Sequence, residues 1–257
     1  MNTAKLKTFA QQSRRILISG VEQRMLYWGF EGKSKVFEEP KSIAGGIIHR
    51  GVIIDDPHAL QMWKALKSAV LKNGYKHIVE EAAYTWFNRI LAIKILSQNG
   101  YEQPQVDYGD DGLEIPEILR KARAGRYSFL DKNSSERLKL ILNDYDQEYN
   151  AFAILLEGYC HTNSLIRRVF GLLNDFTGLL IPANILDKNG FIHLLNSGDS
   201  ITKEDYRKVE LIGWLYQFYI SEKKDEVFKK FKKNQKAEAE DIPAATQIFT
   251  PNWIVKY

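Results

Sequence analysis

The sequence is poor in the features that mark secreted and membrane proteins. Cys160 is the only cysteine, so no disulfide can form within the chain, as is usual for proteins of a reducing cytoplasm. The first apolar run, Ile16–Ile18, is too short for a secretory signal. The most apolar stretch, 211–220, is about half the length needed to cross a bilayer. We therefore expect a soluble cytoplasmic protein.

A cluster of metal ligands is also missing. The histidines stand apart at positions 49, 58, 77, 161 and 193, and one cysteine cannot supply the paired thiolates of a structural zinc site. Cys160 is expected to be a core thiol beside the start of a helix. The sequence predicts no metal centre.

The composition is that of a folded globular protein. Hydrophobic residues make up 44% and aromatic residues 12% of the 257 positions, which is enough to build a sizeable core and excludes disorder along the whole chain. The formal net charge of +4 is weakly basic. A nucleic-acid partner therefore has to be argued from where the lysines cluster rather than from the mean charge.

Hydrophobic periodicity predicts a mostly α fold. Apolar residues recur at three- and four-residue steps from Leu6 to Val21, with Asn2 or Thr3 available as a cap. The period is lost near residues 29–56, where glycines and β-branched residues predict an irregular or short β insertion. The expected fold class is a multi-helix domain with this single insertion.

Capping signals divide the rest of the chain into further helices. Asp56-Pro57 predicts a helix start, and Asn73-Gly74 and Asn99-Gly100 predict helix ends. The first expected helices are 57–73, with Leu60, Trp63, Leu66 and Val70 inward, then 75–99, and a short one from Pro116 to Gly125. A long helix capped by Ser134 or Ser135 should carry Leu138, Ile141, Leu142, Tyr145 and Tyr149 inward. Shorter helices are expected within 160–173 and 192–195, and a last one over 202–233 with a Thr202–Asp205 capping box.

Three stretches, taken together and in order, carry a family resemblance. They are Glu81–Arg89, which continues to Asn99–Tyr101, then Ile212–Lys224, and then Ile242–Val255. The sequence resembles the N-terminal region of the PglX-like adenine-specific DNA methyltransferases of BREX phage defence. The resemblance is strong in these blocks and faint in the loops between them.

The resemblance implies a far longer enzyme that transfers a methyl group from S-adenosyl-L-methionine to N6 of adenine in DNA. Such enzymes hold the adenine with an Asn-Pro-Pro-aromatic motif and the cofactor with a Gly-rich loop, and this sequence contains no Pro-Pro pair and no Gly-x-Gly. We expect a truncated chain, with a helical N-terminal domain at 1–240 and a linker with the start of the methyltransferase domain at 241–257. Alone it should be inactive and bind no cofactor.

Within the third block, Phe249, Thr250 and Pro251 resemble the loop that opens the cofactor pocket in amino-methyltransferases. Proline fixes its own φ and holds Thr250 extended, which could aim a hydroxyl at the cofactor. Taken without the rest of the sequence, Thr250-Pro251 is more simply interpreted as a turn that joins two domains. The three blocks together favour the cofactor loop.

The most basic stretch predicts a possible contact with DNA phosphates. Its lysines are Lys229, Lys230, Lys232, Lys233 and Lys236. The charge pattern by itself favours a solvated helix end whose lysines offset the helix dipole, with Phe228 and Phe231 spaced for packing.

Other motifs have simpler explanations. Glu222 and Lys224 resemble the end of a nuclease motif but lie in a helical pattern, and Trp86 and Trp214 could stack on bases but lie on apolar helix faces. Asn88 and Arg89 lie between aromatic residues and could form a buried polar contact with Glu80 or Glu81, and the sequence does not distinguish these alternatives. The leading hypothesis is an accessory domain that braces the catalytic domain and contacts DNA or other BREX proteins. The alternative is a stand-alone helical interaction module without a cofactor.

Overall fold

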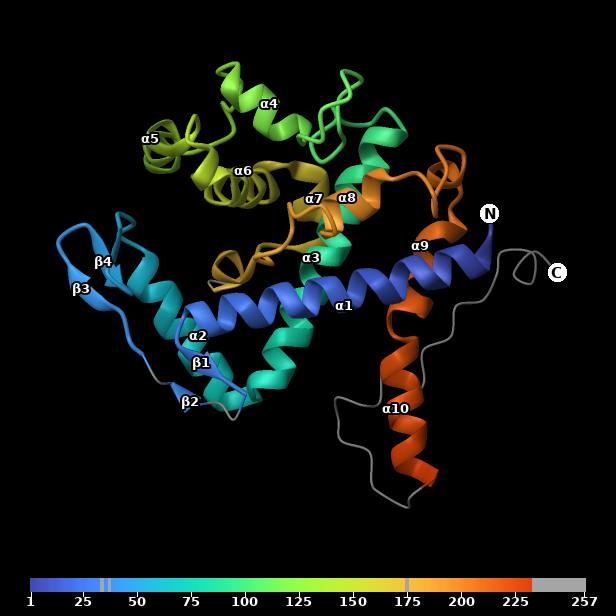
Figure 1. The fold of residues 1–257 in the computed structure, drawn as a ribbon, viewed down its shortest axis with the longest axis horizontal. Coiled ribbons are helices and arrows are strands. Elements are labelled where there is room, and N and C mark those ends of the chain that lie inside the picture. The colour runs from blue at the N-terminus through green and yellow to red at the C-terminus, as the bar shows by residue number, and fades with distance from the viewer. Residues whose placement is uncertain (33–34, 37, 174–175, 233–257) are drawn as a thin grey trace. The chain divides into compact units, whose positions relative to one another are not determined.

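The computed structural model describes residues 1–32, 35–36, 38–173 and 176–232 (Figure 1). This part of the chain is mostly helical, with its short strands confined to residues 30–54, so the predicted fold class is confirmed. None of the helices in these ranges is both long enough and apolar enough to span a bilayer. The helices are α1 (Thr3–Tyr27), α2 (Ala59–Asn73), α3 (Tyr75–Gln98), α4 (Glu117–Arg123), α5 (Lys132–Ile141), α6 (Glu148–Thr162), α7 (Ser164–Phe170), α8 (Phe191–Asn196), α9 (Glu210–Tyr219) and α10 (Ser221–Lys232).

The chain divides into two compact units. One unit comprises Met1–Arg15 together with the chain from Leu194 onward, and the other comprises Ile16–His193. The long helix α1 contributes to both units. Its first turn is capped as predicted, because the Asn2 side chain accepts a hydrogen bond from the backbone N–H of Lys5 at 3.1 Å. The predicted inward residues Leu6, Phe9, Ser13, Leu17 and Val21 are all buried.

The β insertion follows α1, where the sequence predicts it. Its strands are β1 (Phe30–Glu31), β2 (Lys35–Val36), β3 (Lys41–Ile43), β4 (Gly46–His49) and β5 (Val52–Ile54). β1 pairs with β2, and a separate antiparallel sheet has the order β3-β4-β5. Arg50 and Gly51 join β4 to β5 with φ of 50° and 76°, the positive values that a tight two-residue hairpin turn of type I′ requires.

The start of α2 differs slightly from the prediction. The helix begins at Ala59 rather than Pro57, and the Asp56 carboxylate accepts a hydrogen bond from the backbone N–H of His58 at 2.9 Å. Asp56 therefore closes a turn just ahead of the helix instead of capping it. Because of this offset, Ala59 is buried and Leu60 is only half-buried. The other predicted inward residues, Trp63, Leu66 and Val70, are buried.

The predicted ends of α2 and α3 are confirmed. α2 ends at Asn73 with Gly74 as its C-cap, whose φ of 87° suits glycine, and α3 ends at Gln98 with Asn99 as its C-cap. α3 supplies much of the core of its unit, since Trp86 and Phe87 are fully buried. The Phe87 ring lies 5.7 Å from the ring of Phe191 on α8. These contacts place α3 at the centre of the unit's hydrophobic packing.

The prediction of one long helix capped by Ser134 or Ser135 is wrong. Two helices, α5 and α6, lie side by side instead (Figure 1). The N-cap of α5 is Asp131, whose carboxylate accepts the backbone N–H of Ser134 at 3.0 Å. Tyr145 falls between the two helices and is 78% exposed. Tyr149 belongs to the first turn of α6.

The prediction of a single helix over 202–233 is also wrong. The capping box exists, since the Thr202 hydroxyl donates to the Asp205 carboxylate at 3.0 Å, but it starts only a short 3-10 helix, Asp205–Arg207. Lys208 then adopts an extended conformation before α9 begins. α9 in turn ends at Tyr219, and α10 follows as a separate helix from Ser221.

Candidate functional site

The basic end of α10 is the first candidate surface. Lys229 and Lys232 are exposed on the last turns of the helix, as both interpretations of this stretch require. Lys233, Lys236 and the predicted cofactor-loop residues Phe249, Thr250 and Pro251 lie outside the described residues, as does the side chain of Lys230. The described lysines therefore leave the DNA-contact hypothesis untested.

The two aromatic residues of α10 pack on each other. The rings of Phe228 and Phe231 lie edge to face with centroids 6.0 Å apart, and the ammonium of Lys224 lies 6.0 Å from the Phe228 ring centroid. The side chains are 43% and 39% exposed. They form a small partly exposed cluster rather than a buried part of the core.

The start of α10 is fixed by an ion pair rather than by a catalytic motif. The Glu222 carboxylate pairs with Arg14 at 3.4 Å and also with Arg15, both on α1. The Gln11 amide donates to the Ser221 hydroxyl at 3.3 Å. Glu222 thus lies on a helix and has two cationic partners, which is unlike the strand-borne acidic pair of a metal-dependent nuclease.

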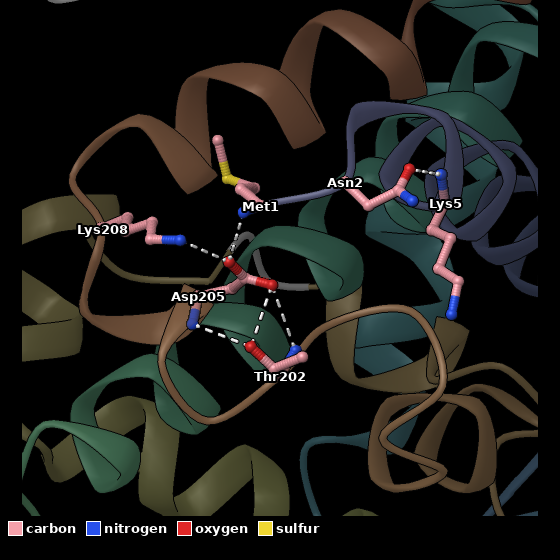
Figure 2. Close-up of polar contacts among 6 residues, drawn as sticks. All are labelled: Met1, Asn2, Lys5, Thr202, Asp205 and Lys208. Atoms are coloured by element: carbon pink, nitrogen blue, oxygen red, sulfur yellow. Dashed lines mark hydrogen bonds and ion pairs between the residues drawn. The ribbon is translucent and has the colours of Figure 1, made fainter.

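Asp205 is the centre of a second polar network (Figure 2). Its carboxylate lies 3.3 Å from the N-terminal ammonium of Met1 and 2.9 Å from the ammonium of Lys208, and it accepts the Thr202 hydroxyl. Burial opposes its ionisation, but the hydrogen bonds from Lys208, Thr202 and the N-terminus outweigh burial and lower the pKa of Asp205 to about 2. The network joins the start of α1 to the segment before α9.

Cys160 is buried, as predicted, although it lies near the end of α6 rather than beside a helix start. Burial raises the pKa of its thiol to about 12, so the thiol stays protonated at neutral pH. Burial and the nearby Arg89 and Arg167 lower the pKa of His161. Within the described ranges, no three His, Cys, Asp or Glu side chains group closely enough to hold a metal ion.

The guanidinium of Arg89 does not make the contact with Glu80 or Glu81 that the sequence suggested. That group donates to the carbonyls of Phe170 and Gly171, at 3.2 and 3.3 Å, where α7 ends. Burial lowers the pKa of Arg89. The residue therefore helps satisfy the C-terminal carbonyls of a helix, which is a structural role.

The tryptophans considered as base-stacking residues pack within the protein. Trp86 is fully buried, as its place on an apolar helix face predicts. Trp214 is half-buried, and its ring is stacked on Phe218 with centroids 5.4 Å apart. Trp86 is therefore unavailable for stacking on nucleic acid.

A cleft of about 830 Å³ lies within the unit formed by Ile16–His193. It is bounded by the end of α1, by β5 and the start of α2, and by α5 and α6. Among the described residues that line it, the acidic ones are Asp55, Asp56, Asp131 and Glu157, and the basic ones are Arg24, Arg137, His58 and His161. The cleft combines the size of a ligand pocket with convergent charged groups.

Glu157 is the most perturbed carboxyl in the cleft. Burial raises its pKa to about 7, the nearby charge of Asp56 adds to this rise, and Arg137 opposes it. Arg137 itself pairs with Asp56 at 2.6 Å. The side chain of Tyr149, at the cleft wall, donates its hydroxyl to the Ile181 carbonyl at 2.6 Å. A carboxyl poised near neutral pH beside an existing ion pair is the kind of group found at binding sites.

No pattern in the sequence indicates this cleft. Asp56 predicts only a helix start, and Glu157 and Arg137 belong to no local motif. Their only sequence signal is a charged residue within an apolar helical pattern, which is the case for Glu157 between Leu156 and Gly158. That signal is too common to select a site.

Comparison with known proteins places this chain beside adenine-specific methyltransferases. No protein-family profile matches it. Over its whole length it is 34% identical to the adenine-specific methyltransferase BrxX of Escherichia coli O9:H4 (strain HS), in an alignment of 267 residues, and 33% identical to the adenine-specific methyltransferase PglX of Lacticaseibacillus casei (strain Zhang), in one of 280 residues. The chain spans 21% and 22% of the length of these relatives. The resemblance stated from the sequence is confirmed.

Proposed function

We propose that this chain, which matches PglX-like adenine-specific methyltransferases over its full length, is the helical accessory domain of such an enzyme. The complete protein would use S-adenosyl-L-methionine to methylate N6 of adenine in DNA and would act in the cytoplasm as part of BREX phage defence. The observation that supports this is the match along the entire chain to relatives about five times as long.

The motifs that the chain lacks indicate which functions would belong to the rest of the complete protein. It has no Pro-Pro pair and no Gly-x-Gly, so the adenine pocket and the Gly-rich loop of the complete protein would lie outside it. The chain alone would then show no methyl transfer. In the complete protein, the segment with Phe249, Thr250 and Pro251 would form one wall of the cofactor pocket, after a helical domain at 1–240. We place DNA contact at the basic end of α10 as a secondary, sequence-independent role.

The test compares the 257-residue chain with the complete gene product. Each is incubated with duplex DNA and S-adenosyl-L-methionine, and N6-methyladenine is measured by mass spectrometry. The complete product should methylate DNA, and the chain alone should not. Methylation by the chain alone would contradict the accessory role. A gene product that lacks an Asn-Pro-Pro-aromatic segment and methylates no DNA would instead support the stand-alone interaction module.

A further inference from the structure

The cleft between β5, α5 and α6 carries the opposite charge to the chain as a whole. The protein has a formal net charge of +4, whereas the described cleft lining holds three aspartates and Glu157, which is partly ionised at neutral pH, against two arginines. Phosphate groups are repelled from such a lining, and cationic groups are attracted to it. This polarity separates the cleft from any DNA-binding role.

Both arginines of the lining already have partners. Arg137 pairs with Asp56 at 2.6 Å. Arg24 donates to the Leu179 carbonyl at 3.1 Å, and its guanidinium lies 4.7 Å from the ring centroid of Tyr27. Both arginines keep their charge, but the two together offset only part of the acidic charge inside the cleft.

Glu157 has no comparable partner. Its carboxyl accepts no hydrogen bond from the part of the chain that the structure describes, and its half-buried side chain lines the cleft. It also lies directly against Gly178, where an added Cβ would stand 2.2 Å from one carboxylate oxygen. An acceptor that faces the cleft without a donor can accept hydrogen bonds from a bound group.

Part of the rim of the cleft is apolar. Ile53 on β5 is 66% exposed and Leu140 on α5 is 81% exposed, and Val52 is exposed beside them. β5 is an edge strand, since the sheet order is β3-β4-β5. An exposed apolar edge strand is a usual docking place for an extended peptide.

We propose that this cleft binds an arginine side chain of a partner protein, with the guanidinium at Glu157 and the neighbouring aliphatic side chains on the Ile53 and Leu140 rim. A metal ion is a poorer fit, because within the described ranges no three ligand side chains group together. A planar guanidinium satisfies a carboxylate through two parallel hydrogen bonds, and its aliphatic stem suits the apolar entrance.

The test uses a fluorescein-labelled pentapeptide, glycine-valine-arginine-valine-glycine with blocked ends, and the same peptide with citrulline in place of arginine. Citrulline has nearly the same shape but no charge. Fluorescence anisotropy with the 257-residue chain should show that the arginine peptide binds at least about tenfold more tightly. Glu157→Gln should abolish this difference. Glu136→Gln, the same change at an exposed site of α5 outside the cleft, should preserve it.

Two further measurements keep the result interpretable. Circular dichroism and thermal melting establish that the Glu157→Gln protein is folded, and Ile53→Ser should weaken both peptides equally, by about threefold, because it removes only apolar contact. Equal binding of the two peptides, or no binding at millimolar peptide, would overturn the proposal. So would tighter binding of a labelled DNA duplex by Glu157→Gln than by the wild type, since that would identify the cleft as a nucleic-acid site.

Discussion

The guanidinium of Arg137 and the carboxylate of Asp56 form an ion pair at 2.6 Å, although they are 81 positions apart in the chain. The same carboxylate accepts the backbone N–H of His58 in the turn before α2. One acidic side chain therefore connects the start of α2 to α5. It also places a negative charge near Glu157, and this proximity has a measurable consequence for stability.

Glu157 should make the protein less stable as the pH rises through neutrality. Its pKa is raised from 4.5 to about 7, first by burial and then by Asp56, with Arg137 opposing. Below pH 4.5 the folded and unfolded chains both hold the proton. Between 4.5 and about 7 only the unfolded chain releases it, so folding is increasingly penalised, by at most about 3 kcal/mol.

Glu157→Gln should remove this penalty. Urea titrations from pH 4 to pH 8 should show a wild-type free energy of unfolding that falls relative to the variant as the pH rises, so that the variant is the more stable protein above about pH 7. Glu136→Gln serves as the matched control and should follow the wild type. Parallel curves for wild type and Glu157→Gln would show that this carboxyl ionises normally in the folded protein.

Asp205 should have the opposite dependence on pH. Its folded pKa of about 2 lies below its ordinary value of 3.8, so its contribution is complete above about pH 4 and is lost as the pH falls towards 2. Asp205→Asn should cost at most about 2 kcal/mol of unfolding free energy at pH 7 and almost nothing at pH 2. Chemical denaturation at both values measures this. The exposed Asp199→Asn is the control, and an equal loss in both variants would contradict the assignment.

The sequence predicted those parts of the fold that local chemistry determines. Gly74 ends α2 because its positive φ suits glycine, and Asn2 caps α1 with its own side chain. The break between α5 and α6 was missed because the apolar period continues from Leu138 to Tyr149 without interruption. The interrupting signal was Asp144, whose carboxylate accepts the backbone N–H of Asp146 and starts a 3-10 helix there.

The cleft could not be predicted in the same way. Asp56, Arg137 and Glu157 come from three separate elements and are brought together only by tertiary packing. Their positions in the sequence do not indicate that the three residues lie close together in the fold. The capping box of Thr202 and Asp205 shows the same limit, since its hydrogen bonds were predicted but the extended conformation of Lys208 that ends the helix was not.

In the complete gene product, Thr250→Ala and Pro251→Ala should each weaken binding of S-adenosyl-L-methionine by about tenfold. The expectation follows from the resemblance of Phe249, Thr250 and Pro251 to a cofactor loop, in which the proline holds the threonine extended. Isothermal titration calorimetry measures the affinity. The same substitutions at Thr246 and Pro243 are the controls, and unchanged affinity in both test variants would show that the loop resemblance carries no function.

The basic end of α10 gives a test that separates phosphate contact from simple solvation. Replacing Lys229, Lys230, Lys232, Lys233 and Lys236 with glutamine should lower DNA affinity only if these lysines contact phosphates. Each lost contact should then reduce the slope of log K against log salt by about one unit, equally for unrelated duplexes. Fluorescence anisotropy at several salt concentrations measures the slope.

A charge-matched variant shows whether position or total charge matters. It carries glutamine at five exposed lysines outside α10, namely Lys41, Lys64, Lys72, Lys188 and Lys203. If α10 contacts DNA, this variant should keep the wild-type slope, whereas a loss shared by both variants would indicate only nonspecific attraction.

Phe228→Ala and Phe231→Ala should each cost less than the roughly 3–5 kcal/mol of a buried phenylalanine, because the side chains are 43% and 39% exposed. A loss of unfolding free energy as large as that of a buried phenylalanine would mean that α10 is held mainly by its aromatic residues. In the DNA experiment, identical salt curves for the wild type and the α10 variant would show that these lysines do not contact DNA.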